Sequence, residues 1–167
     1  MIKTGLITLS LLAGALTDAQ AADLCQAANL KMSIDHRDGQ YDGMSHRGVV
    51  LDIRNTGTTA CKLDARPDLI FSGTLSDGTT ATAKAKSSPG MHPGPVLPPV
   101  ILAPQQTQHS LIRWVSGDMF DDGHNCITTG RALLSVGDHT LSTAAEFYMC
   151  APEGRKDYFE LGTPDVQ

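Results

Sequence analysis

The sequence lacks an excess of positive charge. Its 13 Lys and Arg residues are outnumbered by 18 Asp and Glu residues, which gives a formal net charge of -5. Proteins that bind nucleic acid or anionic membrane surfaces need the opposite balance, because phosphate groups attract basic side chains. The charge therefore argues against nucleic acid and anionic membranes as partners.

Several motifs of catalysis and metal binding are also missing. No Cys-x-x-Cys pair occurs, which argues against a thioredoxin-like redox site and a zinc knuckle. No Gly-x-Ser-x-Gly turn occurs, so the nucleophile elbow of the α/β-hydrolases is absent. The oxygen ligands of the segment 118–125 do not have EF-hand spacing, which favours a solvated acidic loop over a calcium site; they are Asp118, Asp121, Asp122 and Asn125. We therefore expect a protein that is not an enzyme.

Long apolar runs are missing as well, except at the N-terminus. Lys3 precedes the apolar stretch 5–16, and Ala-Gln-Ala at 19–21 has the small-x-small form that signal peptidases cleave. The stretch is shorter than the roughly 20 residues that span a bilayer. We expect residues 1–21 to be a cleaved signal peptide and residues 22–167 to form a single domain. The mature protein would have no membrane span and would be exported to the periplasm or the extracellular space.

The predicted mature part contains all four cysteines of the chain, namely Cys25, Cys61, Cys126 and Cys150. An even number of cysteines in an exported chain indicates disulfides, two in this case. Four cysteines can pair in more than one way, and their spacing alone does not choose between the pairings.

Short segments of alternating apolar and polar residues run through the mature chain, with turn residues between them. We expect strands at 30–36, 48–55, 61–64, 68–75, 79–85, 109–115, 131–137, 140–149 and 157–162. At most one turn of helix is expected, within 23–30. This rhythm of strands and turns is typical of an all-β protein built as a two-sheet β-sandwich.

Proline is concentrated in one segment, because residues 87–104 hold six of the nine prolines. Proline fixes φ and removes a backbone donor, so we expect an extended loop at 89–99. This loop is either a crossover between the two sheets or a ligand-binding loop, and the crossover is favoured.

The order of several motifs matches a known pattern. Asn-Thr-Gly at 55–57 is followed by Cys61, Leu63 and Pro67. Leu-x-Pro at 102–104 precedes an apolar strand that ends in Trp114. Together with Cys25, Leu30 and Cys126, this order resembles a bacterial family of exported immunoglobulin-like domains of unknown function. The resemblance covers most of the mature chain, from Cys25 to Cys150.

The resemblance implies an immunoglobulin-like two-sheet β-sandwich with disulfides Cys25–Cys61 and Cys126–Cys150. A Cys25–Cys61 bond would close a loop of about 36 residues and stabilise the fold by roughly 3–4 kcal/mol in the chain-entropy model. Gln105 stands where the family usually has glycine, which implies a turn that is built differently. The resemblance implies no reaction.

The function we favour is that of an exported, non-enzymatic binding or structural module. Its partner would be an unknown protein or a small ligand, no cofactor is expected, and the sequence names neither the ligand nor the oligomeric state. The chain has one Trp, three Tyr and four Phe, with no cluster that predicts a carbohydrate platform. Trp114 is therefore expected in the core.

The alternative function is that of a periplasmic copper-binding protein. Thioether and imidazole ligands suit copper, Cu(I) especially. The candidate ligands fall in predicted loops or at strand ends; they are Met44, His46, Met91 and His92, with Met119 and His124 as outer candidates.

If copper is the ligand, the Met44→Ala, Met91→Ala double variant binds Cu(I) more weakly than the unaltered protein, because two soft sulfur ligands are lost. Titration of the metal-free protein against a competing Cu(I) chelator measures the difference. Equal affinities for the two proteins would contradict the copper hypothesis.

Overall fold

The computed structural model describes residues 22–86, 97–117, 119 and 125–167. The predicted signal peptide at 1–21 lies outside these residues, as does most of the proline-rich loop. In the described part the chain is all-β, as expected, and its helical segments are two short 3₁₀ turns: η1 (Ala27–Asn29), inside the stretch where a turn of helix was expected, and η2 (Arg37–Gly39). No helix of the described residues is long and apolar enough to span a membrane.

The strands follow the predicted rhythm closely in the first half of the chain. Their bounds are β1 (Leu30–Asp35), β2 (His46–Asn55), β3 (Cys61–Leu63), β4 (Leu69–Leu75), β5 (Thr80–Ala85), β6 (Val100–Leu102), β7 (Thr107–Val115), β8 (Cys126–Val136), β9 (His139–Ala144), β10 (Tyr148–Cys150), β11 (Asp157–Leu161) and β12 (Asp165–Val166). Strands β6 and β12 were not expected, and the single strand expected at 140–149 is divided into β9 and β10.

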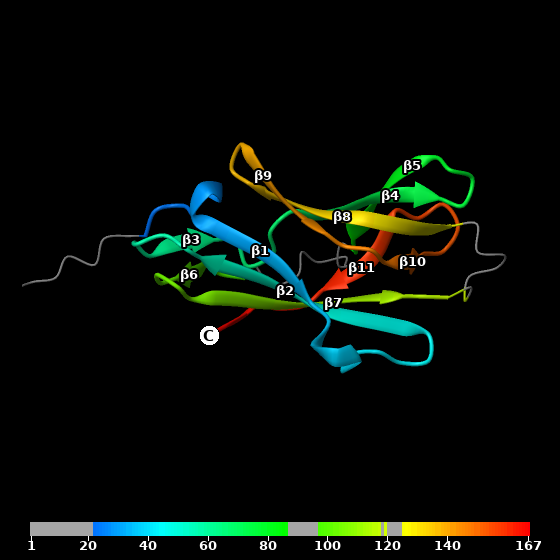
Figure 1. The fold of residues 1–167 in the computed structure, drawn as a ribbon, viewed down its shortest axis with the longest axis horizontal. Helices are drawn as coiled ribbons and strands as arrows, with labels where there is room; N and C mark the ends of the chain where they lie inside the picture. The colour runs from blue at the N-terminus through cyan, green and yellow to red at the C-terminus, as the bar shows by residue number, and fades with distance from the viewer. Residues whose placement is uncertain (1–21, 87–96, 118, 120–124) are drawn as a thin grey trace, which may run out of the picture.

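The expectation of an immunoglobulin-like two-sheet sandwich is wrong, because the main sheet closes on itself. Six strands form a closed barrel in the order β7, β10, β8, β4, β5 and β11, and β11 returns to β7. Strands β1 and β2 extend from β7 outside the ring, β9 extends from β8, and β3 pairs with β6 in a separate two-stranded sheet. Figure 1 shows β8 and β9 along one side of the molecule, β2 and β7 along the other, and β10 and β11 between them.

The physical cause of the closure is that the connecting strands are hydrogen-bonded on both sides. Strand β11 runs parallel to β5 and antiparallel to β7, with Phe159 opposite Trp114. Strand β10 pairs with β8 and meets β7 at Cys150 and Val115. In a sandwich the two sheets face each other without such shared strands. Each of the six strands of the ring is paired with two others, whereas the outer strands of the two sheets in a sandwich each have a free edge.

A β-bulge in β8 explains why the strand expected at 140–149 is divided. The pairing of β4 with β8 shifts between Ser72, which faces Arg131, and Gly73, which faces Thr129, so that Gly130 has no partner on β4. Before the bulge β8 pairs with β10, and after it β8 pairs with β9. The segment 145–147 crosses the bulge between the two strands, because a bulge bends the strand that carries it and redirects its neighbours.

The interior contains a series of aromatic side chains, each packed against the next, from different parts of the barrel. Phe71 of β4 packs edge-on against Phe159 of β11 at 5.0 Å and against Phe147 at 5.7 Å. Phe147 in turn packs against Trp114 of β7 at 4.7 Å. All four rings are buried, which confirms the expectation that Trp114 lies in the core. Aromatic rings bury large apolar areas, so these packed rings link the strands that close the barrel.

Gly73, the glycine of β4 at the bulge, is predicted to be essential for the pairing of β4 with β8. A Cβ on Gly73 would overlap the carbonyl oxygen of Thr128 and lie 2.6 Å from Cα of Thr129. We expect Gly73→Ala to lower the free energy of unfolding by about 1–3 kcal/mol or more, because the clash is with backbone atoms that cannot turn away. Denaturant unfolding followed by the fluorescence of Trp114 measures the change.

Gly130→Ala is the matched control, since a Cβ there meets no atom within 4 Å. We expect this variant to be close to the unaltered protein in stability. Equal losses in the two variants would contradict the steric argument.

Candidate functional site

The disulfides join Cys25 to Cys61 and Cys126 to Cys150, the pairing that the family resemblance implied. The first attaches the segment before η1 to the start of β3, and backbone hydrogen bonds between Cys25 and Lys62 and between Lys62 and Asp23 reinforce it. The second links directly opposed residues of β8 and β10. Two disulfides indicate that the protein forms in an oxidising environment, as exported proteins do.

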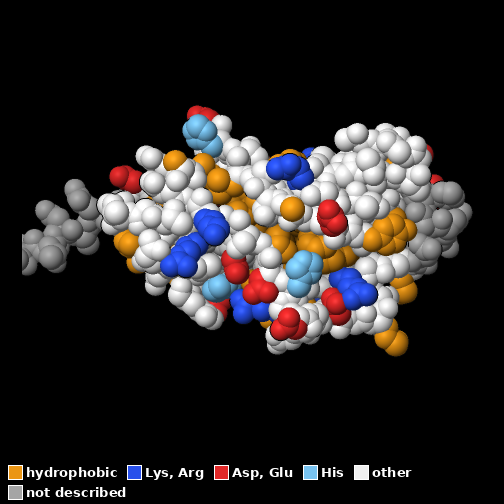
Figure 2. Space-filling view, in the orientation of Figure 1, with side chains coloured by type: hydrophobic (Ala, Val, Ile, Leu, Met, Phe, Trp, Pro, Cys, Tyr) orange, Lys and Arg blue, Asp and Glu red, His pale blue; other side chains and the backbone are white. Residues whose placement is uncertain are grey.

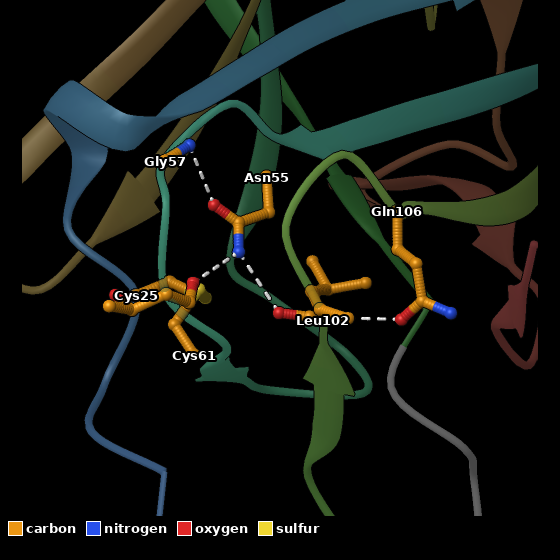
Figure 3. The surroundings of a disulfide bond; sticks show 8 residues. Cys25, Asn55, Gly57, Cys61, Leu102 and Gln106 are labelled. Carbon is orange, nitrogen blue, oxygen red and sulfur yellow. Dashed lines mark hydrogen bonds between the residues drawn. A yellow bond between two sulfur atoms is a disulfide. The ribbon is translucent and has the colours of Figure 1, made fainter.

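Asn55 is the centre of the Asn-Thr-Gly motif, and its side chain is buried with all of its polar groups in hydrogen bonds. Its Nδ2 donates to the carbonyl oxygens of Thr59 (2.8 Å) and Leu102 (3.0 Å), and its Oδ1 accepts from the backbone N–H of Gly57 (2.9 Å). Figure 3 shows Asn55 between the Gly57 turn, the Cys25–Cys61 bond and Leu102. The motif therefore serves the structure, because it joins the ends of β2 and β6 beside the disulfide.

The turn at Gln105 keeps the conformation that glycine would adopt, so the expectation of a differently built turn is wrong for the backbone. Pro104 and Gln105 are the central residues of a four-residue turn closed by a 3.1 Å bond from the N–H of Gln106 to the carbonyl of Ala103. Gln105 has φ 69°, the left-handed value required at the third position of a type II turn. Its side chain accepts a hydrogen bond from Arg54 (2.9 Å) at the surface.

Three of the proposed copper ligands are among the described residues, and three are not. Met44 is fully exposed, and His46 and Met119 are exposed; Met91, His92 and His124 lie outside the described residues. A backbone bond from Ser116 to Ser45 (3.0 Å) places the loop of Met44 and the start of the loop of Met119 at the same end of the barrel. Within the described part, no group of three or more His, Cys, Asp or Glu side chains is arranged to hold a metal. The copper hypothesis stays a prediction.

A cleft of about 350 Å³ opens between η2, the start of β2, the end of β7 and the segment 145–148. Trp114 and Phe147 form its floor, and we call it the aromatic cleft. Exposed polar side chains surround it, namely His36, Asp42, Arg47 and Glu146. Figure 2 shows one face of the molecule, with hydrophobic side chains near its centre and acidic, basic and histidine side chains around them.

The floor of the aromatic cleft is held by hydrogen bonds to the β8 bulge. The buried hydroxyl of Thr129 donates to the carbonyl of Ala145 (2.6 Å) and accepts from the N–H of Phe147 (3.0 Å). The backbone N–H of Thr129 also donates to the carbonyl of Phe147 (2.8 Å). Trp114 donates from Nε1 to the carbonyl of Tyr148 (2.9 Å), so its one donor is satisfied. These bonds fix the backbone of Phe147 and the ring of Trp114, and the two rings pack against each other.

The wall formed by η2 is strained and tightly connected. Arg37, Asp38 and Gly39 have φ values of 47°, 51° and 77°, and the left-handed conformation costs about 1–2 kcal/mol at each residue other than glycine. Asp35 stabilises this backbone, because its Oδ1 accepts from the N–H of Arg37 (2.8 Å) and its Oδ2 pairs with Nε of Arg37 (3.0 Å). At the end of the wall, the His36 ring packs edge-on against Phe147 at 5.7 Å.

A second cavity, of about 470 Å³, lies between the β4–β5 hairpin and residues 154–158. The guanidinium group of Arg155, which lines this cavity, is already paired, because it donates to both carboxylate oxygens of Asp157 (2.8 and 2.6 Å). These hydrogen bonds lower the pKa of Asp157 to about 2, whereas burial raises the pKa of Tyr158. The hydroxyl of Tyr158 donates to Asn125 (2.9 Å). The charged and hydroxyl groups of Arg155 and Tyr158 in this cavity are therefore engaged with neighbouring side chains.

Sequence reasoning identified Trp114 as a core residue but missed its partners in the aromatic cleft. Phe147 and Glu146 fell within an expected continuous strand, and Asp42 and Arg47 preceded the strand expected at 48–55. Only the tertiary structure brings these four residues together. A possible signal was Glu146-Phe147-Tyr148, which interrupts the alternation of the residues before it.

The fold and the cleft define an all-β, disulfide-bonded barrel domain with a lateral cleft. The chain belongs to the family described as Domain of unknown function (DUF4232), which matches residues 25–158. This agrees with the resemblance to a family of unknown function, although the immunoglobulin-like architecture implied by that resemblance is not found. Neither a curated protein nor a solved structure matches the chain.

Removing the side chain of Gln105 tests whether its backbone is strained. Gln105→Gly and Gln105→Ala both lose the contact with Arg54, but only glycine adopts positive φ without cost. We expect the glycine variant to be more stable than the alanine variant by about 0.5–1 kcal/mol in thermal or denaturant unfolding. Equal stabilities would show that the turn relaxes without strain.

Proposed function

We propose that the protein is an exported, non-enzymatic binding module whose ligand occupies the aromatic cleft. The observation that carries the proposal is the floor of two fixed aromatic rings beneath a ring of exposed polar side chains. Small-molecule sites combine an apolar floor with a few placed polar groups in this way. The volume, about 350 Å³, suits a small ligand or a single side chain of a partner.

Two further observations support a binding role for this cleft. Backbone strain is retained at Arg37 and Asp38, and such strain clusters at ligand-binding and active sites in proteins. The floor is also pre-formed, since Thr129 and Trp114 hold it by hydrogen bonds. A pre-formed site loses less entropy when its ligand binds.

The non-enzymatic part of the proposal rests on how the polar side chains are used. His36, the imidazole group of the cleft, packs against the Phe147 ring, and the Asp42 carboxylate is paired with Arg47. General base catalysis and nucleophile activation need such groups directed at a hydroxyl or thiol instead. Export to the periplasm or the extracellular space is proposed with this function, in line with the two disulfides.

Trp114 allows a direct test, because it is the one Trp in the chain and it lines the cleft. The test uses three small aromatic probes, namely benzylammonium, benzyl alcohol and benzoate. We expect at least one of them to change the fluorescence emission of Trp114 in a saturable way. Ser116→Phe should abolish the change, because Ser116 lines the cleft and phenylalanine would fill part of it.

The control is Ser33→Phe, which places the same side chain at an exposed position of β1 outside the cleft. This variant should respond to the probes like the unaltered protein. A response to none of the three probes, or a response that Ser116→Phe leaves intact, would contradict a binding site in the aromatic cleft. Turnover of a substrate that depends on one cleft residue would overturn the non-enzymatic proposal.

A further inference from the structure

The charges around the aromatic cleft are not balanced. Arg47 is paired with Asp42 through its guanidinium Nη1 and the carboxylate Oδ2. The other oxygen of Asp42 accepts from the backbone N–H of Gly48 at 3.4 Å, which ties the pair to the start of β2. The positive charge of Arg47 is therefore already compensated within the cleft.

Glu146 is the carboxylate that remains. Its side chain is exposed at the wall of the cleft and makes no ion pair or hydrogen bond with another described residue. Its backbone is nevertheless fixed, because Thr129 binds the residue on each side of it and Ala145 donates to the carbonyl of Gly130 at 3.1 Å. The fold thus holds an unpaired carboxylate next to an aromatic floor.

Aromatic floors and carboxylates attract the same kind of group. The faces of Trp and Phe rings carry partial negative charge, and a cation within about 6 Å of a ring centroid is stabilised by it. A carboxylate beside the rings adds an ion pair. The net charge of the protein, -5, favours the approach of cations as well.

We propose that the aromatic cleft binds an organic cation, an ammonium or guanidinium group, with Glu146 as its counter-ion and the Trp114–Phe147 floor beneath it. This inference rests on the proposed function and names the chemical class of its ligand. An anionic ligand would have to displace Asp42 from Arg47 and would meet Glu146 unpaired, so the described charges disfavour it.

The three matched probes test the charge preference, because they share a phenyl ring and differ in the sign of the attached group. We expect benzylammonium to bind more tightly than benzyl alcohol, and benzoate to bind most weakly, in titrations followed by Trp114 fluorescence at low ionic strength. Glu146→Gln should weaken benzylammonium binding by about two- to fivefold, the effect of losing one exposed ion pair, and leave benzyl alcohol binding unchanged.

Glu153→Gln is the control for the change in net charge, since Glu153 is exposed and does not line the cleft. It should leave the affinity for all three probes unchanged. Benzoate binding as tightly as benzylammonium, or benzylammonium binding that is equal in Glu146→Gln and the unaltered protein, would overturn the cation proposal. If Ser116→Phe still abolished binding in that case, the cleft would remain a binding site and only its ligand class would be wrong.

Two further probes distinguish a free cation from a side chain of a partner protein. Butylguanidinium represents the free cation, and the capped tripeptide acetyl-Gly-Arg-Gly-amide represents an arginine side chain in a peptide. Tighter binding of the peptide would support a protein partner, and tighter binding of butylguanidinium would support a small ligand. Binding of acetyl-Gly-Gln-Gly-amide as tight as that of the arginine peptide would contradict the cation proposal.

Discussion

Strand β7 is hydrogen-bonded along both of its edges, and this double pairing organises the rest of the molecule. One edge pairs with β2 over nine successive residue positions, from Thr107 to Val115, and the other is shared by β12, β11 and β10. With both edges occupied, every second side chain of β7 must enter the interior. Ile112 and Trp114 fill it, whereas Gln108 and Ser110 are buried polar groups without a side-chain hydrogen bond to the described residues. The position of Trp114 below the cleft is a direct result of this alternation.

The second determinant of the cleft is the bulge in β8. It separates the parts of β8 that pair with β9 and β10, and it places Thr129 where its hydroxyl can bind both Ala145 and Phe147. Phe147 then turns inward onto Trp114 and Phe71, while the neighbouring Glu146 turns outward. One local irregularity thereby supplies both the apolar floor and the charged wall. The same residues serve stability and the proposed binding, so the two roles need experiments that separate them.

The motif that carries the family resemblance has a different task. Asn55, Gly57 and the Cys25–Cys61 bond hold the ends of β2, β3 and β6 together at one end of the molecule (Figure 3). They do not line the aromatic cleft. The residues of this motif therefore build the fold, whereas the proposed ligand would be recognised by residues outside the motif. This is why the motif indicates a local structure, the junction of β2, β3 and β6 beside the disulfide, and no activity.

The sequence by itself determined the all-β class, the positions of most strands and the burial of Trp114. Alternation of apolar and polar residues reports which face of a strand is buried, and turn residues such as those at 76–78 report where it ends. The partners of each strand were decided only by the tertiary structure. Both a sandwich and a barrel bury one face of each strand, so their sequence patterns are alike, and the pairing of β11 with β5 and β7 joins residues more than 40 positions apart. The aromatic cleft was beyond the sequence for the same reason. Arg47 lies opposite Trp114 through the pairing of β2 with β7, and Phe147 joins them from the segment beside the β8 bulge. Both arrangements depend on long-range contacts that a local pattern does not contain.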